Sequence, residues 1–329
     1  MSSRRSISRR TFVKTIAGAA AAAGFVAAAR PFAGLDALAA PPRTAAPQGS
    51  MPLRPLGNTG HRVRLFSLGG QAVLETPGTE EASLAILNRA IDLGVNYLDT
   101  ARRYGRGTSE GYLGRVMKTR RKEVFLASKT RERGYDGAIR ELEESLTTLQ
   151  TDHLDLWQCH NVMYDSELDQ MFAKDGVLKA MEKAREQKLV RFAGITGHYD
   201  PHVLRRGIER YPFDTILMAL NAADRHRASF IEHLLPVAVG KRMGRIGMKI
   251  PARGRLLRED GVATMKDAMR YVLTLPVSTV IVGVDTLAEL EENVAIAREF
   301  APLDDAGMKR LEDLARPHAE EAMFFKLPA

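Results

Sequence analysis

Four polar side chains that can take part in proton transfer stand close to three short apolar runs of the chain. Asp99, Lys129 and His160 each end such a run, and Tyr104 follows Asp99 by five residues. A buried ammonium beside a phenol favours the phenolate and lowers the pKa of the tyrosine. A carboxylate such as Asp99 would keep the lysine charged, and an imidazole such as His160 can orient a carbonyl oxygen through a hydrogen bond. The four types together predict acid catalysis on a carbonyl group.

Each of these residues also has an ordinary structural interpretation. An aspartate at this place often caps a helix, a histidine after an apolar run often sits in the core, and a lysine is usually solvated. Tyr104 could simply pack its loop. The catalytic interpretation depends on the combination, because all four residues follow three successive apolar runs.

Apolar or β-branched runs alternate with amphipathic stretches from about residue 52 onward. In the stretch 138–149, Ile139, Leu142 and Leu146 recur every three or four residues, as one buried helix face requires. We expect strands at 64–68, 96–100, 124–129, 154–160, 191–196, 215–220, 245–250 and 279–282. We expect helices at 81–93, 109–118, 136–149, 176–186, 201–211, 228–238, 264–273 and 287–300.

Eight such units predict the α/β class and a single-domain (β/α)8 TIM barrel, in which catalytic side chains gather at the carboxyl ends of the strands. A doubly wound sheet is the main alternative, but residues 68–73 lack the G-x-G-x-x-G turn that it would need after the first strand. Residues 53–63 look like a small hairpin, with Asn58 and Gly60 at its turn, which could close the barrel floor. The barrel with a C-terminal tail would therefore span 52–329.

The N-terminal segment has the pattern of an export signal. Arg9 and Arg10 precede Phe12 and Lys14, an uncharged Ala/Gly-rich run follows at 15–29, and small residues suited to cleavage stand near residue 39. This run is short for a membrane span, which needs about 20 apolar residues. We expect a twin-arginine (Tat) signal peptide at 1–40, a linker at 41–51, the Tat export machinery as a partner and a periplasmic location. An uncleaved signal that tethers the protein to the membrane is the alternative.

Composition limits the remaining classes of function. The chain is 45% hydrophobic and 27% charged, which is typical of a globular protein. A single cysteine, Cys159, excludes an internal disulfide framework. The net charge is +8, but residues 1–40 hold six basic residues and one acidic residue, so we expect no nucleic-acid partner. The histidines outside the site show no metal-ligand spacing, and no metal is expected. The oligomeric state is not indicated.

The motifs resemble those of the aldo-keto reductase family over residues from about 52 to about 300. They are the runs Asp99-Thr100-Ala101-x-x-Tyr104-Gly105, Ser109-Glu110-x-x-Leu113-Gly114, Ser128-Lys129 and His160-Asn161. The resemblance implies a (β/α)8 barrel and hydride transfer between a nicotinamide cofactor and a small-molecule aldehyde, ketone or alcohol substrate. It also implies that Tyr104 donates the proton, Lys129 tunes it, Asp99 holds Lys129 and His160 orients the substrate.

The same resemblance implies a cofactor, NADP or NAD, and a set of residues that would contact it. Leu217 stands where many relatives carry a glutamine, which puts one amide contact in doubt. Asp285 and Glu289 stand where NADP-preferring relatives carry basic residues, and carboxylates there would repel a 2′-phosphate. We therefore expect NAD to be accepted at least as well as NADP. The implied cofactor residues are Gly70, Thr196, Asn221, Lys249, Gly254, Gly283, Glu292 and Asn293.

Two other functions remain open at this point. The chain could be a nicotinamide-responsive regulatory or binding subunit with little turnover, although such a subunit would not need all four polar groups. It could also be an isomerase or aldolase that forms a Schiff base on Lys129, but a lysine paired with Asp99 stays protonated and is a poor nucleophile. Loops 162–172 and 225–230 and the tail 317–329 would select the substrate. Phe324 and Phe325 in this tail either close over the site or pack on the surface.

Overall fold

The computed structural model describes residues 49–326. The predicted signal peptide at 1–40 lies outside the described residues, as does most of the predicted linker at 41–51. Between residues 49 and 326, no helix combines the length and the apolar character that crossing a bilayer requires.

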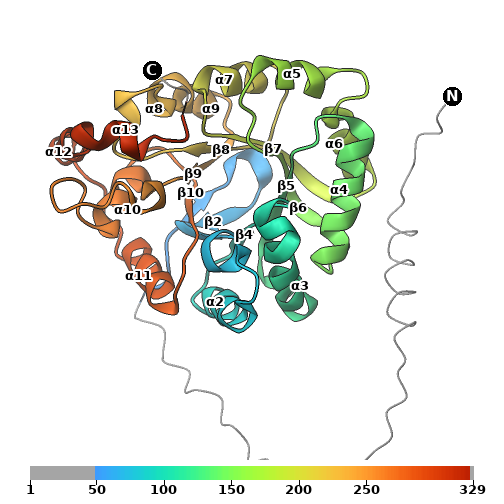
Figure 1. Cartoon of the computed structure of the whole chain (residues 1–329), viewed down its shortest axis with the longest axis horizontal. Coiled ribbons are helices and arrows are strands. Elements are labelled where there is room, and N and C mark those ends of the chain that lie inside the picture. Colours follow the sequence, from blue (N-terminus) through green and yellow to red (C-terminus); the bar gives the residue numbers. More distant parts are fainter. Residues whose placement is uncertain (1–48, 327–329) are drawn as a thin grey trace, which may run out of the picture.

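Eight parallel strands close into a barrel in the order β10-β3-β4-β5-β6-β7-β8-β9, which confirms the predicted fold (Figure 1). Short apolar runs form these strands because a barrel strand is covered by helices on one side and by the packed interior on the other. The strands are β3 (Phe66–Gly69), β4 (Tyr97–Asp99), β5 (Phe125–Thr130), β6 (Leu154–Cys159), β7 (Val190–Gly197), β8 (Thr215–Ala219), β9 (Gly244–Met248) and β10 (Thr279–Val282).

Helices surround this barrel, and each buries one apolar face against it. In α4 (Tyr135–Thr148), Ile139, Leu142 and Leu146 are buried, as their spacing predicts. The other helices around the barrel are α2 (Glu80–Asp92), α3 (Thr108–Arg120), α5 (Asp165–Phe172), α6 (Val177–Glu186), α7 (Pro201–Arg210), α10 (Met265–Thr274) and α11 (Leu287–Arg298), and α12 (Asp305–Ala315) packs against α10.

The stretch 228–238, predicted as one helix, forms two shorter ones, α8 (Phe230–His233) and α9 (Leu235–Gly240). Pro236 stands at the start of α9, where its missing N–H costs nothing, whereas inside a longer helix it would interrupt the hydrogen bonds. The predicted single helix is therefore wrong, because the proline starts a new helix although the apolar spacing continues. Helices α5 and α12 were not among the predicted elements.

The predicted hairpin consists of β1 (Leu53–Pro55) and β2 (Arg62–Arg64), which pair antiparallel. Leu56 and Val63 are fully buried in a cluster with the inward-facing side chains of the barrel strands. Phe125 of β5 belongs to that cluster, and Figure 1 shows β2 within the ring of strands. The hairpin thus fills the floor of the barrel and leaves the end formed by the carboxyl termini of the strands for the site.

Candidate active site

The alternation of side chains along the strands brings three of the four predicted catalytic residues to the same end of the barrel interior. Tyr97 in β4 and Phe125 in β5 belong to the inner cluster of the barrel. Side chains two or four residues further along a strand face the same way, so Asp99 and Lys129 also point inward. His160 directly follows β6, which pairs with β5. The strand geometry thus places these groups together at the rim.

Tyr104 reaches the same place through a tight loop. It begins the kinked segment η3 (Tyr104–Gly107), in which Gly105 and Arg106 have left-handed φ values of 56° and 55°. A Cβ atom at Gly105 would overlap the carbonyl oxygen of Glu75. A glycine is required at this position because the backbone is both left-handed and crowded.

Lys129 links the other groups. Its Nζ forms an ion pair with Asp99, and it also donates to the carbonyl oxygen of Thr100 at 2.8 Å and to the hydroxyl of Tyr104 at 3.2 Å. The side chains of Lys129 and Asp99 are 1% and 3% exposed. An ammonium has three N–H donors, and these three acceptors use all of them. The lysine is therefore held in a fixed position against the phenol.

Gln158 is a part of this arrangement that the sequence interpretation missed. Its Nε2 donates to the second oxygen of Asp99 at 3.1 Å, and it lies beside Lys129 in the register between β6 and β5. Gln158 orients the carboxylate that holds the lysine. The available signal was its position two residues before His160, since alternation along the strand points both side chains inward.

His160 completes the group as a neutral imidazole. Its ring lies edge-on to that of Tyr104, with centroids 5.6 Å apart and planes at 82°. Burial, and then the charge of Lys129, hold the pKa of His160 well below its ordinary value. Its Nδ1 is buried and makes no hydrogen bond to the described residues. The residue as a whole is partly exposed, so another part of its ring faces the rim of the barrel.

The pKa of Tyr104 lies above its ordinary value, contrary to the expectation from the sequence. Burial raises this pKa, and the opposing effect of the Lys129 charge is smaller. Burial on its own would lower the pKa of Lys129, but Asp99 and Tyr104 outweigh it and raise this pKa. At neutral pH the phenol therefore keeps its proton and the amine keeps its charge.

Residues of the second motif hold the surrounding elements together. Ser109 and Thr100 share a hydrogen bond of 2.8 Å between their hydroxyls, and Ser128 donates to the buried carboxyl group of Glu110 at 2.6 Å. These contacts tie α3 to the ends of β4 and β5. The motif therefore supports the geometry of the four polar groups and does not add a fifth reacting group.

A cleft of about 530 Å³ opens beside Tyr104 and Asp99 and crosses the ends of β9, β10 and β3. Its volume falls within the range of about 300–1,000 Å³ that is typical of ligand sites. Six of the eight predicted cofactor residues line it. They are Gly70, Lys249, Gly254, Gly283, Glu292 and Asn293.

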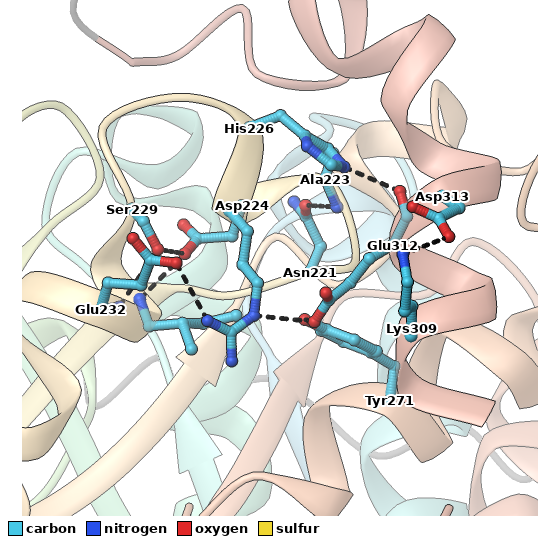
Figure 2. Close-up of polar contacts among 12 residues, drawn as sticks. Asn221, Ala223, Asp224, His226, Ser229, Glu232, Tyr271, Lys309, Glu312 and Asp313 are labelled. Atoms are coloured by element: carbon cyan, nitrogen blue, oxygen red, sulfur yellow. Dashed lines mark hydrogen bonds and ion pairs between the residues drawn. The ribbon is translucent and has the colours of Figure 1, made fainter. Parts of the chain in front are cut away.

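The other two predicted cofactor residues use their polar atoms within the protein. The hydroxyl of Thr196 accepts the backbone N–H of Asn161 at 2.8 Å. The side chain of Asn221 accepts the N–H of Ala223 at 3.0 Å and donates to the carbonyl oxygen of Lys249 at 3.2 Å (Figure 2 labels Asn221 and Ala223). Both residues brace loops beside the site, and their contact with a cofactor stays a prediction.

The two ends of the cleft differ in character. Leu217 and Met248, which belong to or pack against the inner cluster of the barrel, line one part, and Asp285 and Glu289 at the start of α11 line another. The cationic residues of the lining are Lys249 and Arg253. The apolar part of the cleft fits the nicotinamide of a dinucleotide, and the positive charges of Lys249 and Arg253 fit its pyrophosphate.

Comparisons with known proteins agree with this geometry. A sequence model described as the Aldo/keto reductase family matches residues 65–261. The chain is 29% identical over 306 residues to L-galactose dehydrogenase of Arabidopsis thaliana, a match that covers 80% of this chain and 94% of that protein. Its structure is similar to the holo form of the aldo-keto reductase AKR11C1 from Bacillus halodurans, with a TM-score of 0.70, 25% identity and coverage of 81% and 97%. An aldo-keto reductase from Klebsiella pneumoniae, solved in complex with NADPH, has the same fold, with a TM-score of 0.63, 20% identity and coverage of 78% and 93%.

Proposed function

Since the chain belongs to the aldo/keto reductase family of oxidoreductases, we propose that it transfers a hydride between NADP(H) or NAD(H) and an aldehyde, ketone or alcohol, with Tyr104 as the proton donor. The observation that carries this proposal is the 3.2 Å hydrogen bond from Lys129 Nζ to the hydroxyl of Tyr104. It places a charged amine directly against a neutral phenol at the edge of the cleft.

The bound nicotinamide supplies the hydride, and the residues of the chain handle the proton and the charge. As negative charge grows on the carbonyl oxygen, the Tyr104 hydroxyl gives its proton to that oxygen. Neutral His160 offers the same oxygen a second hydrogen bond. The phenolate left on Tyr104 is stabilised by Lys129, and Asp99 in turn keeps Lys129 charged. In the oxidation of an alcohol, the same groups act in reverse.

The lining of the cleft indicates how the cofactor would be held. Lys249 and Arg253 would meet the pyrophosphate. Met248 and Leu217 would contact the nicotinamide ring, and Asn293 would bind at the adenosine end. L-galactose dehydrogenase, the relative from Arabidopsis thaliana, is named for the oxidation of a sugar, which is chemistry that these groups could also perform.

The substitution Tyr104→Phe tests the proposal directly. It removes the acidic hydroxyl and keeps the ring, so we expect kcat for aldehyde reduction to fall by about 10²–10⁴-fold. Binding of NADPH, measured by quenching of the protein fluorescence, should be nearly unchanged. Tyr211→Phe, at the end of α7, is the matched control and should keep the activity of the unsubstituted enzyme.

Two results would contradict the proposal. A Tyr104→Phe variant with undiminished kcat would exclude this tyrosine as the proton donor. An unsubstituted protein that binds NADPH tightly but reduces none of a panel of aldehydes and ketones would favour the nicotinamide-responsive binding subunit.

We also propose that residues 1–40 direct export of the folded protein by the Tat machinery to the periplasm. The support is the order of the twin arginines, Phe12, Lys14 and the small-residue run that follows them. Mass spectrometry of the native protein should find a new N-terminus near residue 40 and a retained dinucleotide. An intact N-terminus in the membrane fraction would instead indicate a tethered protein.

A further inference from the structure

The C-terminal tail contains a buried ion pair that lies outside the group formed by Asp99, Tyr104, Lys129 and His160. After α12, the chain passes through the short helix α13 (Ala319–Ala322) to Lys326. The ammonium of Lys326 pairs with the carboxylate of Asp224, and the two side chains are 0% and 1% exposed. Charged side chains are seldom buried so completely unless they are paired. The tail is therefore held by a specific contact at Lys326.

The loop after β8 forms a complete socket for this lysine. Lys326 Nζ also donates to the carbonyl oxygens of Arg227 at 2.9 Å and Ala228 at 3.0 Å. The second oxygen of Asp224 accepts the Ser229 hydroxyl and the N–H of Ile231, both at 2.8 Å. Each charge thus has several partners, as a buried ion pair needs if it is to offset the loss of hydration.

The loop after β8 and the neighbouring helix α10 both contact Glu312 of α12. Tyr271 donates its hydroxyl to the carboxylate of Glu312 in α12 at 2.7 Å, and Arg225 donates to the same oxygen at 2.7 Å. The ring nitrogen Nε2 of His226 lies 2.7 Å from the carbonyl oxygen of Glu312. Figure 2 shows Glu312, Tyr271 and His226 gathered at this point. Contacts with α12 therefore also hold the loop that forms the socket, independently of Lys326.

Phe325, directly before the lysine, contacts residues that follow the carboxyl ends of two barrel strands. Its ring is edge-on to that of His198, which follows β7, with centroids 5.4 Å apart. The Nζ of Lys249, which follows β9 and lines the cleft, is 5.9 Å from the centre of the Phe325 ring. The backbone N–H of Asn161, directly after His160, donates to the hydroxyl of Thr196 near the end of β7 at 2.8 Å, so His198 follows the strand that adjoins His160. Phe325 thus spans from the cofactor cleft toward the side where a carbonyl compound would meet His160.

We propose that Phe325 is a specificity-determining wall of the substrate-binding end, and that the Lys326–Asp224 pair is the positioning contact that holds this wall in place. The inference rests on the proposed function and extends it to the selection of substrates by size. A ring fixed at the rim excludes bulky groups on the carbonyl carbon. Loss of the ammonium would leave Asp224 buried without its counter-charge, and the tail would leave its socket to restore hydration.

Two variants test the two parts of the proposal. Phe325→Ala removes the wall, and Lys326→Met removes the positive charge while keeping a chain of similar length. We compare kcat/KM for propanal with kcat/KM for 2-naphthaldehyde. In both variants the ratio should move toward the bulky aldehyde by about tenfold or more. A fraction of unfolded enzyme lowers both rates equally, so the ratio does not respond to stability.

Lys309→Met is the matched control. Lys309 pairs with Asp313 on α12, but the two side chains are 71% and 47% exposed, and an exposed pair contributes little. This variant should leave the ratio unchanged. Hydrogen exchange provides a readout that does not depend on turnover, because Lys326→Met should speed exchange in residues 319–326 and Lys309→Met should not.

The outcomes distinguish three statements: that the Lys326–Asp224 pair holds the tail, that Phe325 limits the size of the substrate, and that the enzyme reduces carbonyl compounds. Unchanged hydrogen exchange in the tail of Lys326→Met would contradict the role of the ion pair in holding the tail. An unchanged ratio of the two kcat/KM values in Phe325→Ala would contradict the role of Phe325 in specificity. If the unsubstituted enzyme reduces neither propanal nor 2-naphthaldehyde with any nicotinamide cofactor, the reaction itself is contradicted. The exchange experiment still decides whether the ion pair holds the tail.

Discussion

The candidate active site combines one ion pair, Lys129 with Asp99, and two neutral side chains, Tyr104 and His160. Burial acts in opposite directions on the two neutral groups, since it raises the pKa of Tyr104 and lowers that of His160. Each shift favours the uncharged form. Lys129 keeps its charge because Asp99 is close, and Gln158 fixes the orientation of that carboxylate. In the proposed reaction, a phenol that keeps its proton next to a fixed positive charge gives the proton up only as negative charge develops on the substrate.

The lowered pKa of Lys249 predicts that cofactor binding depends on pH. Burial, and then the charge of Arg253, lower the pKa of Lys249 to about 8. A bound pyrophosphate favours the ammonium, so this pKa should be higher in the complex. The affinity for NADH should therefore be greatest below pH 8 and fall at higher pH, by up to about tenfold per unit. Fluorescence titration between pH 7 and 9.5 measures this dependence.

Substitution of the same lysine provides the control for this titration. Lys249→Met should weaken NADH binding at pH 7 and flatten its pH dependence, whereas Lys241→Met, an exposed lysine after α9, should retain both. An affinity of the unsubstituted enzyme that is constant over this pH range would show that Lys249 does not contact the cofactor.

At the scale of elements, the ends of strands and helices determine which groups face the ligand. The carboxyl ends of β4 and β5 hold Asp99 and Lys129, and the loop after β9 holds Lys249 and Arg253. The N-terminus of α11 differs from a typical phosphate site. The Glu289 carboxylate already accepts the backbone N–H of Asp285 at 2.7 Å, and Thr286 accepts the N–H of Glu289 at 3.2 Å. One N–H of the first helical turn, that of Glu289, is thus already bonded, and the Glu289 carboxylate lies at this helix end.

This helix end predicts that NAD binds at least as tightly as NADP. A dinucleotide with its nicotinamide at Tyr104 must place its adenosine at the opposite end of the cleft, where Asp285, Glu289 and Glu292 lie. These carboxylates would repel a 2′-phosphate. The double variant Asp285→Ser/Glu289→Gln should shift the ratio of dissociation constants toward NADP by about fivefold to tenfold.

Glu291→Gln is the control for this prediction, because Glu291 lies on the same helix but pairs with Arg89 at 2.7 Å on the surface. Calorimetric titration of each protein with NAD and NADP measures the ratio. A strong preference of the unsubstituted enzyme for NADP would contradict the prediction.

For the molecule as a whole, the two ends of the barrel have separate tasks. The hairpin closes one end with apolar side chains, and the carboxyl ends of the strands place the proposed catalytic residues at the other. The interior between them is packed by residues such as Tyr97, Phe125 and Leu156. Loss of packing at the floor should therefore affect stability more than catalysis.

Leu56→Ala tests this separation. Leu56 is fully buried among the inner side chains of the barrel, so its truncation should lower the free energy of unfolding by about 2–5 kcal/mol. At temperatures where the variant stays folded, kcat should match that of the unsubstituted enzyme. Leu287→Ala, at a leucine that is 42% exposed, should change stability by only about 0.5 kcal/mol. A marked loss of kcat in folded Leu56→Ala would show that the floor and the site are coupled.

The sequence by itself determined the barrel and the group of four polar residues. The strand and helix periods are local properties of the chain, and in a parallel barrel all the strands end on the same side. Asp99, Lys129 and His160 could therefore be placed together from their positions at the ends of apolar runs. The motif spacing added Tyr104, although its loop is irregular.

Only the tertiary structure decided the net direction of the Tyr104 pKa, the contact of Gln158 with Asp99 and the attachment of the tail. The first depends on how completely the phenol is buried, which the order of residues does not state. The tail depends on a pair that is 102 residues apart in the chain, Lys326 and Asp224. Burial and long-range pairing arise from packing of the whole chain, and local patterns carry no information about them.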